Sequence, residues 1–171
     1  YEKLSPRIAD TAKMMWTTYV ILTASEILGL WLCGMPIFDA VCHSFSTIAT
    51  GGFSTHNNSL EYYDSAAIHY TVTFFMFVSG INFVMLIYLL RGKVRNFVQD
   101  EEQRWYSVAV MVFAVMLTVG LYIARPGWTG VEMERAFRDS IFTVISSMTS
   151  TGYTISDYMY WPVVAWVVIF F

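Results

Sequence analysis

Long apolar segments dominate this chain and are separated by short polar stretches. Three of them are long enough to cross the ~30 Å hydrocarbon core of a bilayer as helices, at residues 14–34, 66–90 and 105–124. A fourth apolar segment starts near residue 160 and continues to residue 171, where the sequence stops. About twelve residues give only ~18 Å of helix, so we expect this sequence to be a piece of a longer chain.

Two short segments between the long ones, residues 39–49 and 139–149, cannot cross a bilayer. Each could form about eleven residues of helix, or ~16 Å. A run rich in hydroxyl groups and glycine follows each of them, at residues 50–54 and 150–154, with neither helical nor strand periodicity. Irregular backbone at membrane depth is tolerated only where it is buried in protein or lines a water-filled cavity. We therefore predict two short re-entrant helices, each followed by a loop.

The two short segments and their loops repeat at an offset of 100 residues. The aligned pairs include Asp39 and Asp139, Ser46 and Ser146, Gly52 and Gly152, Phe53 and Tyr153, and Ser54 and Thr154. An apolar span precedes each loop, and a polar stretch and another apolar span follow it. This agreement in both residues and flanking pattern indicates an internal duplication.

The duplication predicts an all-α membrane protein of two tandem units, residues 1–98 and 99–171, each built as helix, short pore helix, filter loop and helix. In the first unit these parts are residues 14–34, 39–49, 50–54 and 66–90; in the second they are residues 105–124, 139–149, 150–154 and those from about 160. Residues 1–13 are polar, and Pro6 is expected to break any long helix there. Each unit crosses the membrane twice, so both units point the same way.

Composition supports a membrane location. The sequence is 56% hydrophobic and only 13% charged, with a mean hydropathy of +0.51, which is too apolar for an ordinary soluble domain. Arg91, Lys93 and Arg95 follow the span at residues 66–90 and place that end on the cytoplasmic side. We expect a multi-pass protein of the cell inner membrane or plasma membrane, in contact with the lipid bilayer.

Several classes of function are disfavoured by what the sequence lacks. The net charge of −3 and the absence of a basic patch argue against nucleic-acid binding. An intramembrane enzyme using Ser44, Ser46 or His43 is a weak alternative, because GxSxG, HExxH and paired intramembrane aspartates are all missing. Cys33 and Cys42 lack the spacing of a metal site and are expected to be small apolar side chains. We predict neither an enzyme nor a cofactor.

The two loops are suited to carrying a dehydrated cation. Rings of backbone carbonyl groups can replace the hydration shell of an ion without placing a fixed charge in its path. Glycine permits the backbone conformations that turn successive carbonyls inward, and it adds no side chain to narrow the passage. The negative ends of the two short helices would favour a cation at the same point. The sequence therefore predicts a cation-translocating protein.

The residues that carry this chemistry also resemble a known family. The segment from Phe38 to His56, including the run ATGGFSTH, resembles the second repeat of the Trk/Ktr/HKT superfamily of potassium-translocating membrane subunits, nearest to its TrkH branch. Gly80-Ile81-Asn82-Phe83 is also similar to that family. The run SMTSTGYT at residues 147–154 is similar to the third repeat. The resemblance covers nearly the whole chain.

This resemblance implies a potassium pore made by four such repeats, each like the pore module of a potassium channel, of which this sequence supplies two. It implies that K⁺ is the transported ion and that the filter consists of Thr50, Gly51, Gly52, Phe53, Ser150, Thr151, Gly152 and Tyr153, contributing backbone carbonyls. A homodimer and a TrkA-like cytoplasmic nucleotide-binding regulatory subunit are implied as well. Ser54 and Thr154 replace the second glycine of the TVGYG channel signature, so a looser filter is expected. A two-pore potassium channel-like subunit and a Na⁺/K⁺-translocating HKT-like transporter remain as alternatives.

Four further residues were candidates around the loops. Asp39 and Asp139 are predicted to cap the pore helices rather than to bind ions. Gly80 is either a hinge or gate element or a packing contact, since small residues allow close helix approach. Asn82 faces either the pore or a neighbouring helix.

Three ionisable residues within the apolar segments also have two interpretations. Glu26 lies in the middle of the first span, where an ionisable group suggests function. We favour a hydrogen-bonded or protonated glutamate at a helix contact over a place on the ion path. His43 and His69 could sense protons, but packed or solvated imidazoles are the simpler interpretation.

Overall fold

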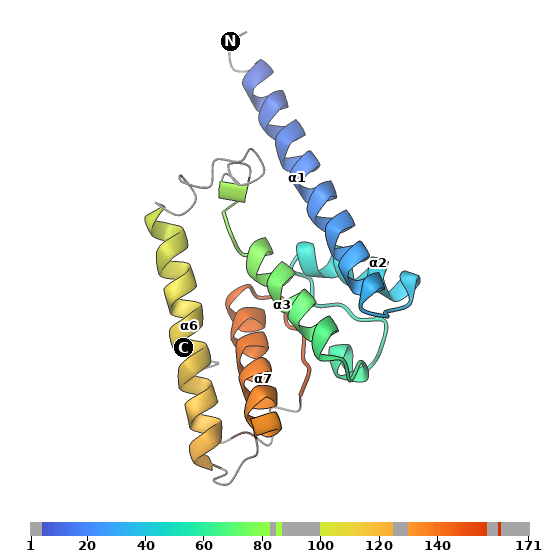
Figure 1. Cartoon of the computed structure of the whole chain (residues 1–171). Coiled ribbons are helices and arrows are strands. Elements are labelled where there is room, and N and C mark those ends of the chain that lie inside the picture. Colours follow the sequence, from blue (N-terminus) through green and yellow to red (C-terminus); the bar gives the residue numbers. More distant parts are fainter. Residues whose placement is uncertain (1–4, 83–84, 87–99, 125–129, 157–160, 162–171) are drawn as a thin grey trace.

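The computed structural model describes residues 5–82, 85–86, 100–124, 130–156 and 161, and every regular element among them is helical. Figure 1 shows the elements, which are α1 (Ser5–Leu32), α2 (Ile37–Ile48), the 3₁₀ helix η1 (Ser59–Tyr62), α3 (Ala66–Ser79), α6 (Glu101–Ala124) and α7 (Gly130–Met148). The predicted all-helical class is confirmed for these residues. The basic cluster at residues 91–95 and nearly all of the predicted fourth span lie outside the described residues.

Helix α1 is longer at its start than the sequence suggested. It begins at Ser5, so Pro6 lies in the first turn and does not break the helix. Proline is tolerated there because the first N–H groups of a helix have no intrahelical acceptor in any case. The helix ends in a tight turn in which Gly34 adopts a φ of 94° and the N–H of Met35 bonds to the carbonyl oxygen of Leu30 at 3.1 Å.

Helix α2 crosses the end of α1 and is the short helix that the sequence predicts. Pro36 sets its start, and Ile48 is its last residue. Its buried residues recur every three or four positions and face α1 and α3; they are Ala40, His43, Ser44, Thr47 and Ile48. A helix of 12 residues is too short to span a bilayer.

Helix α3 differs from the prediction of one span over residues 66–90. It ends at Ser79, and Gly80 and Ile81 form a turn before the chain becomes helical again at residues 85–86. A Cβ atom on Gly80 would lie 2.6 Å from the hydroxyl oxygen of Tyr106 and 2.8 Å from Cγ2 of Thr149. The break therefore occurs where α3 approaches both α6 and the end of α7.

The second short helix also differs from its prediction. It is the C-terminal part of α7, which starts at Gly130 instead of near Asp139. Asp139 is consequently inside a helix, where it cannot act as an N-cap. Because Ala136 stands where the first unit has Pro36, nothing in the sequence interrupts the helix before Asp139.

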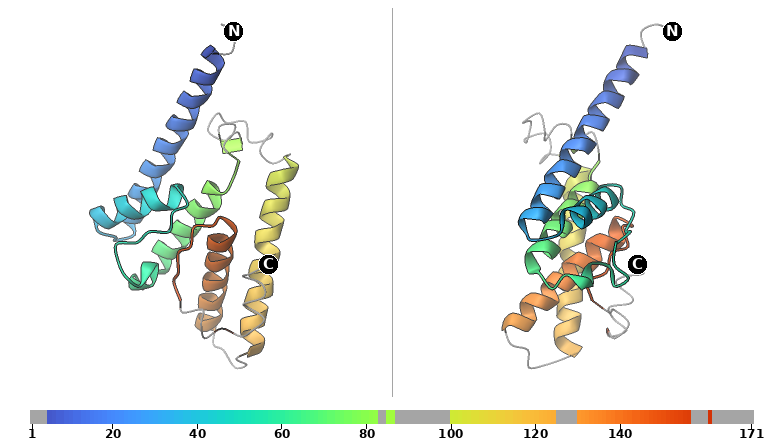
Figure 2. Two further views of the ribbon diagram at one scale, coloured as in Figure 1. Left: turned by 180° about the vertical axis from the view of Figure 1, so that it is seen from behind. Right: turned by 90° about the vertical axis from the view of Figure 1, so that its right-hand side faces the viewer.

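The described helices pack in the parallel arrangement expected of a duplication. In Figures 1 and 2, α1 and α6 run in the same direction, whereas α3 and α7 run back. The main core lies between α2, α3 and α7 and includes fully buried Leu60, Val72, Met76 and Phe142. It also includes Ile145, near the end of α7, and Tyr153 of the second loop.

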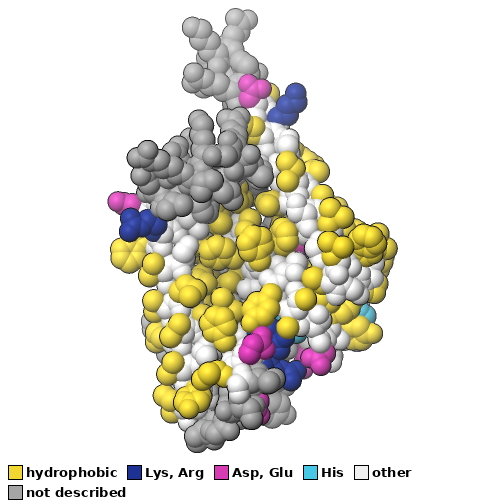
Figure 3. All heavy atoms as spheres, in the orientation of Figure 1, with side chains coloured by type: hydrophobic (Ala, Val, Ile, Leu, Met, Phe, Trp, Pro, Cys, Tyr) yellow, Lys and Arg dark blue, Asp and Glu magenta, His cyan; other side chains and the backbone are white. Residues whose placement is uncertain are grey.

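Two helices are long and apolar enough to cross a membrane, over Ala9–Leu32 and Glu101–Ile123. Only 22% of each apolar stretch is buried inside the protein. Figure 3 shows the resulting apolar surface, which continues along both α6 and α1. A core helix of a soluble protein would be covered by its neighbours, so these faces fit contact with lipid.

Candidate functional site

The first glycine loop begins with a tight turn at the end of α2. Thr50 adopts a left-handed conformation, with a φ of 51°. The N–H of Thr50 bonds to the carbonyl oxygen of Thr47 at 3.0 Å, and the N–H of Gly51 bonds to that of Ser46 at 2.7 Å. These two bonds form the pattern that commonly closes a helix, usually with glycine at the left-handed position. Here a hydroxyl residue occupies it.

The second loop repeats this turn at the end of α7. Ser150 has a φ of 57°. Its N–H bonds to the carbonyl oxygen of Ser147 at 3.1 Å, and the N–H of Thr151 bonds to that of Ser146 at 2.9 Å. Each partner lies 100 residues after its counterpart in the first loop. The duplication therefore extends to individual backbone hydrogen bonds.

A serine on each short helix braces its own loop. Ser46 Oγ accepts a hydrogen bond from the N–H of Phe53 at 2.7 Å, and Ser146 Oγ donates one to the carbonyl oxygen of Tyr153 at 2.9 Å. The two pairs are equivalent by the offset, although the direction of donation is reversed. The sequence alignment paired these serines but did not reveal this role, which depends on the loop folding back over the helix end.

The two loops touch each other at their glycines. Gly52 and Gly152 have φ values of 68° and 85°, in the region that only glycine adopts readily. A Cβ atom on Gly52 would overlap the carbonyl oxygen of Thr151. A side chain at Gly52 is therefore opposed both by the backbone conformation and by the second loop. Of the candidate filter residues, Gly52 thus lies against Thr151 and Gly152.

Tyr153 ties the second loop to the first unit. Its hydroxyl group lies 3.2 Å from the carbonyl oxygens of both His43 and Phe53, to which it donates. The two units are also joined beyond the loops, where the N–H of Leu60 bonds to the carbonyl oxygen of Thr154 at 3.2 Å. The relative position of the two loops is thus fixed by hydrogen bonds between the units.

Both histidines of the two central helices are packed. His43 is fully buried, and its Nε2 lies 3.0 Å from Ser54 Oγ while its Nδ1 lies 2.7 Å from the carbonyl oxygen of Asp39. His69 is also buried, with Nε2 3.2 Å from the carbonyl oxygen of Leu60. Each imidazole holds a loop in place, which favours the packing interpretation.

The two aspartates do not cap helices by side-chain hydrogen bonds. Asp39 is in the first turn of α2, where its charge suits the helix dipole, but Oδ2 accepts a hydrogen bond from the hydroxyl of Tyr63 at 2.6 Å. That bond holds the pKa of Asp39 below its usual value. Asp139 lies within α7, and burial raises its pKa to about 6. The predicted cap at Asp139 is wrong, and at Asp39 the carboxylate bonds to Tyr63 instead.

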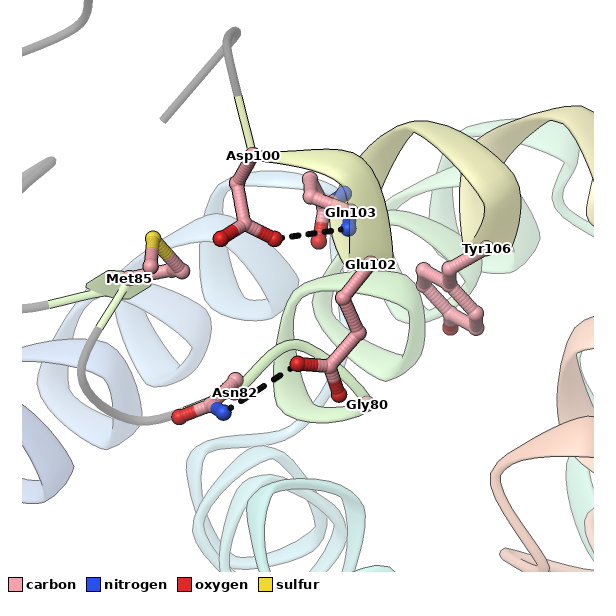
Figure 4. A pocket seen from close by; sticks show the side chains of 7 residues that line it. All are labelled: Gly80, Asn82, Met85, Asp100, Glu102, Gln103 and Tyr106. Carbon is pink, nitrogen blue, oxygen red and sulfur yellow. Dashed lines mark hydrogen bonds between the residues drawn. The ribbon is translucent and has the colours of Figure 1, made fainter. Parts of the chain in front are cut away.

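Gly80 and Asn82 line a small cavity beside the start of α6. Figure 4 shows Asn82 pointing toward Glu102 at the start of α6, with Nδ2 and Oε2 3.5 Å apart. The cavity has a volume of about 80 Å³. Its lining is completed by Met85, Asp100, Gln103 and Tyr106. Asn82 therefore faces a neighbouring helix, and Gly80 is a close packing contact.

The groups that could hold an ion at the loops are backbone and hydroxyl oxygens. Helices α2 and α7 both have their C-terminal ends, toward which their backbone carbonyls point, at the start of the loops. The hydroxyl oxygens of Thr149 and Thr151 lie 2.7 Å apart. Among the residues that the structure describes, no cluster of three or more His, Cys, Asp or Glu side chains could bind a metal. Oxygen ligands without a fixed charge suit a monovalent cation.

Comparison with known proteins agrees with this geometry. The family model described as "TrkH: Cation transport protein" matches residues 2–171. The chain belongs to the TrkH family. It is 38% identical over 161 residues to the Trk system potassium uptake protein TrkH of Salmonella typhimurium and 32% identical over 162 residues to TrkG of Escherichia coli. The family membership expected from the loop sequences is confirmed.

A solved TrkH structure has the same fold. The crystal structure of the potassium transporter TrkH from Vibrio parahaemolyticus matches this chain with a TM-score of 0.87 and 35% sequence identity, over 96% of this chain. The match covers 35% of that chain, and the chain spans about a third of the length of the curated TrkH relatives. The described helices therefore correspond to one part of a TrkH protein.

Proposed function

We propose that the TrkH protein containing this chain takes up potassium, and that the two glycine loops form half of its ion filter. The carbonyl groups of residues 50–53 and 150–153 would coordinate dehydrated K⁺ in place of water. The observation that carries the proposal is the direct contact of the two loops, in which Gly52 leaves no room for a side chain beside the Thr151 carbonyl. The names of the relatives, Trk system potassium uptake proteins, support the same ion.

The whole transporter would need further parts. A closed ring requires two more repeats, and we propose that they belong to the same full-length chain. We further propose that the protein forms a homodimer in the inner or plasma membrane and binds a TrkA-like cytoplasmic nucleotide-binding subunit. The words "Trk system" in the relatives' names support the presence of further components. A two-pore potassium channel-like subunit would be expected to carry the full glycine-tyrosine-glycine signature, whereas Ser54 and Thr154 stand at its second glycine here. A Na⁺/K⁺ HKT-like transporter would differ from the proposal by also moving sodium.

Gly52→Ser in the full-length protein tests the filter directly. The variant should lower rubidium influx by about tenfold or more, or admit sodium, because the new side chain meets the Thr151 carbonyl and a left-handed backbone. The measurement is rubidium influx, with and without sodium, in potassium-uptake-deficient cells. Gly152→Ser should act in the same direction through its left-handed backbone alone, with a φ of 85°, because no described atom lies within 4 Å of a Cβ built there.

Gly130→Ser is the matched control. Gly130 starts α7, and no described atom lies within 4 Å of a Cβ built there. This variant should transport as the unchanged protein does, at equal amounts in the membrane. Unchanged influx and sodium exclusion in Gly52→Ser would overturn the proposed filter.

A further inference from the structure

Glu26 is a carboxyl group enclosed by protein at the middle of an apolar helix. Its side chain has no exposed surface, and it shares a face of α1 with Gly29 and Leu30. That face packs on α3, since a Cβ on Gly29 would lie 3.2 Å from Thr71 Cγ2. The carboxyl group is therefore shielded from both lipid and water, and no N–H or O–H group of the described residues donates a hydrogen bond to either of its oxygens.

The polar side chain that faces this carboxyl group is Thr47, in the last turn of α2. Thr47 is itself fully buried. Its hydroxyl group already donates its only proton to the carbonyl oxygen of His43, at 2.8 Å. Toward Glu26, the Thr47 oxygen can therefore act only as an acceptor.

This arrangement determines which form of Glu26 can bind Thr47. An ionised carboxylate is only an acceptor, so it would face another acceptor with no compensating donor. A charge buried in this way costs several kcal/mol, whereas a neutral acid can donate its proton. Only the protonated carboxyl group forms a hydrogen bond here.

We infer that Glu26 is protonated in the folded protein, donates to Thr47 Oγ1, and thereby acts as a positioning residue for the first filter loop. The connection to the loop is short. The carbonyl oxygen of Thr47 accepts the N–H of Thr50, which begins the loop, at 3.0 Å. The carbonyl oxygen of His43 accepts hydrogen bonds from the hydroxyls of both Thr47 and Tyr153. The Tyr153 hydroxyl also lies 3.2 Å from the carbonyl oxygen of Phe53, in the first loop.

The same hydrogen bonds indicate how Glu26 would influence the filter loops. Thr47 and Tyr153 both donate to the carbonyl oxygen of His43, so one network joins the buried acid to both loops. Glu26 touches no candidate filter carbonyl itself and acts through Thr47. Its effect on ion selectivity rests on the proposed function, whereas its protonation does not.

Infrared spectroscopy of the full-length protein in bilayers tests the protonation. The difference spectrum between the unchanged protein and Glu26→Gln should contain the carbonyl stretch of a protonated carboxylic acid, lost in the variant. Glu61→Gln is the control, because Glu61 is an exposed residue of η1 and should lose carboxylate bands instead. Loss of carboxylate bands alone in Glu26→Gln would overturn the inference.

Selectivity measurements test the positioning role. Glu26→Leu should weaken the preference for rubidium over sodium on the order of tenfold, the equivalent of one hydrogen bond. Glu26→Gln should retain the preference, because its amide can also donate to Thr47. Thr47→Val should match Glu26→Leu, and the double variant should be no worse than either. A network contribution predicts this non-additivity, which two independent packing defects would not produce.

The outcomes separate this inference from the proposed function. If the unchanged protein moved no rubidium, the proposed function would fail while the infrared result still reported on Glu26. The positioning role would be overturned if Glu26→Leu kept full selectivity. It would also be overturned if Glu26→Gln were as impaired as Glu26→Leu, because selectivity would then require an ionised carboxylate and not a hydrogen-bond donor. Where Glu26→Leu does not accumulate in membranes, Thr47→Val and Glu26→Gln decide between these results.

Discussion

Three helix ends in this chain close with the same turn, but with different residues at its left-handed position. Helix α1 uses Gly34, whereas the short helices before the loops use Thr50 and Ser150. A left-handed conformation costs a non-glycine residue roughly 1 kcal/mol. Among these three helix ends, the cost is incurred at the two before the loops, where each hydroxyl residue precedes a glycine-containing run; Ser59, at the start of η1, also has a positive φ of 55°. Strain retained at equivalent positions of a duplicated site fits a functional demand on those residues.

Tyr63 contributes to stability in a pH-dependent way through Asp39. The hydroxyl of Tyr63 lowers the pKa of Asp39 from its ordinary value of 3.8, so it stabilises the folded state when Asp39 is ionised. That contribution is present above 3.8 and is lost as the pH falls through the lowered folded-state value. Tyr63→Phe should therefore reduce the free energy of unfolding by about 1 kcal/mol near neutral pH.

The measurement is thermal unfolding of the full-length protein in detergent, at about pH 7 and about pH 3. The difference between the unchanged protein and Tyr63→Phe should shrink at the lower pH. Tyr62→Phe is the matched control, because Tyr62 is 61% exposed and contributes its ring to a stack on His56. A gap that stays constant with pH would mean that Tyr63 acts by packing alone.

At the scale of helices, the sequence predicted the short helix and loop of each unit but not every boundary. Helix α2 starts at Ile37, two residues before the predicted Asp39, because Pro36 ends the preceding segment. The same reasoning failed in the second unit, where the aspartate matched but Ala136 replaced the proline, so α7 continues back to Gly130. Helix starts follow local sequence signals, and the missing proline was the signal that should have outweighed the aspartate.

The end of α3 at Ser79 could not be read from local sequence. Residues 66–90 contain no Asp, Glu, Lys, Arg or Pro, so their pattern is that of one continuous span. The break depends instead on Gly80 fitting against Tyr106 and Thr149, which are distant in sequence. Likewise, the contact between Gly52 and the second loop is a tertiary feature. The sequence named the candidate filter residues, which stay a prediction, whereas the cross-unit bonds of Tyr153 required the structure.

Gly80→Ala should destabilise the protein by about 1–3 kcal/mol, because its methyl group would meet Tyr106 Oη and Thr149 Cγ2 at less than normal contact distance. Adding Thr149→Ser to Gly80→Ala removes the Cγ2 atom and should recover part of this loss. The measurement is thermal unfolding of the full-length variants. Gly130→Ala, at an uncrowded helix position, should leave the unfolding temperature nearly unchanged. Equal effects of the two alanines would contradict a specific packing role for Gly80.

At the scale of the whole molecule, the packing of α6 indicates which of its sides would face lipid. Its buried residues recur at helical spacing and face α7; they are Val110, Ala114, Leu117 and Leu121. The opposite face exposes a second apolar stripe of Val108, Met111, Val112, Val115, Met116 and Val119. A soluble protein would place polar residues on that face. Apolar residues on both faces are those of a helix with protein on one side and hydrocarbon on the other.

This two-sided packing predicts how a spin label on α6 would behave in the full-length protein. A nitroxide at Val115→Cys, which is 50% exposed at mid-helix, should be accessible to oxygen dissolved in the bilayer but not to a water-soluble nickel complex. A label at Ala114→Cys, one residue away and fully buried against the protein, should be protected from both reagents and more restricted in motion. Collision rates from power-saturation electron paramagnetic resonance distinguish these environments. Access of the nickel complex to position 115 would place this face of α6 in water and refute its assignment to lipid.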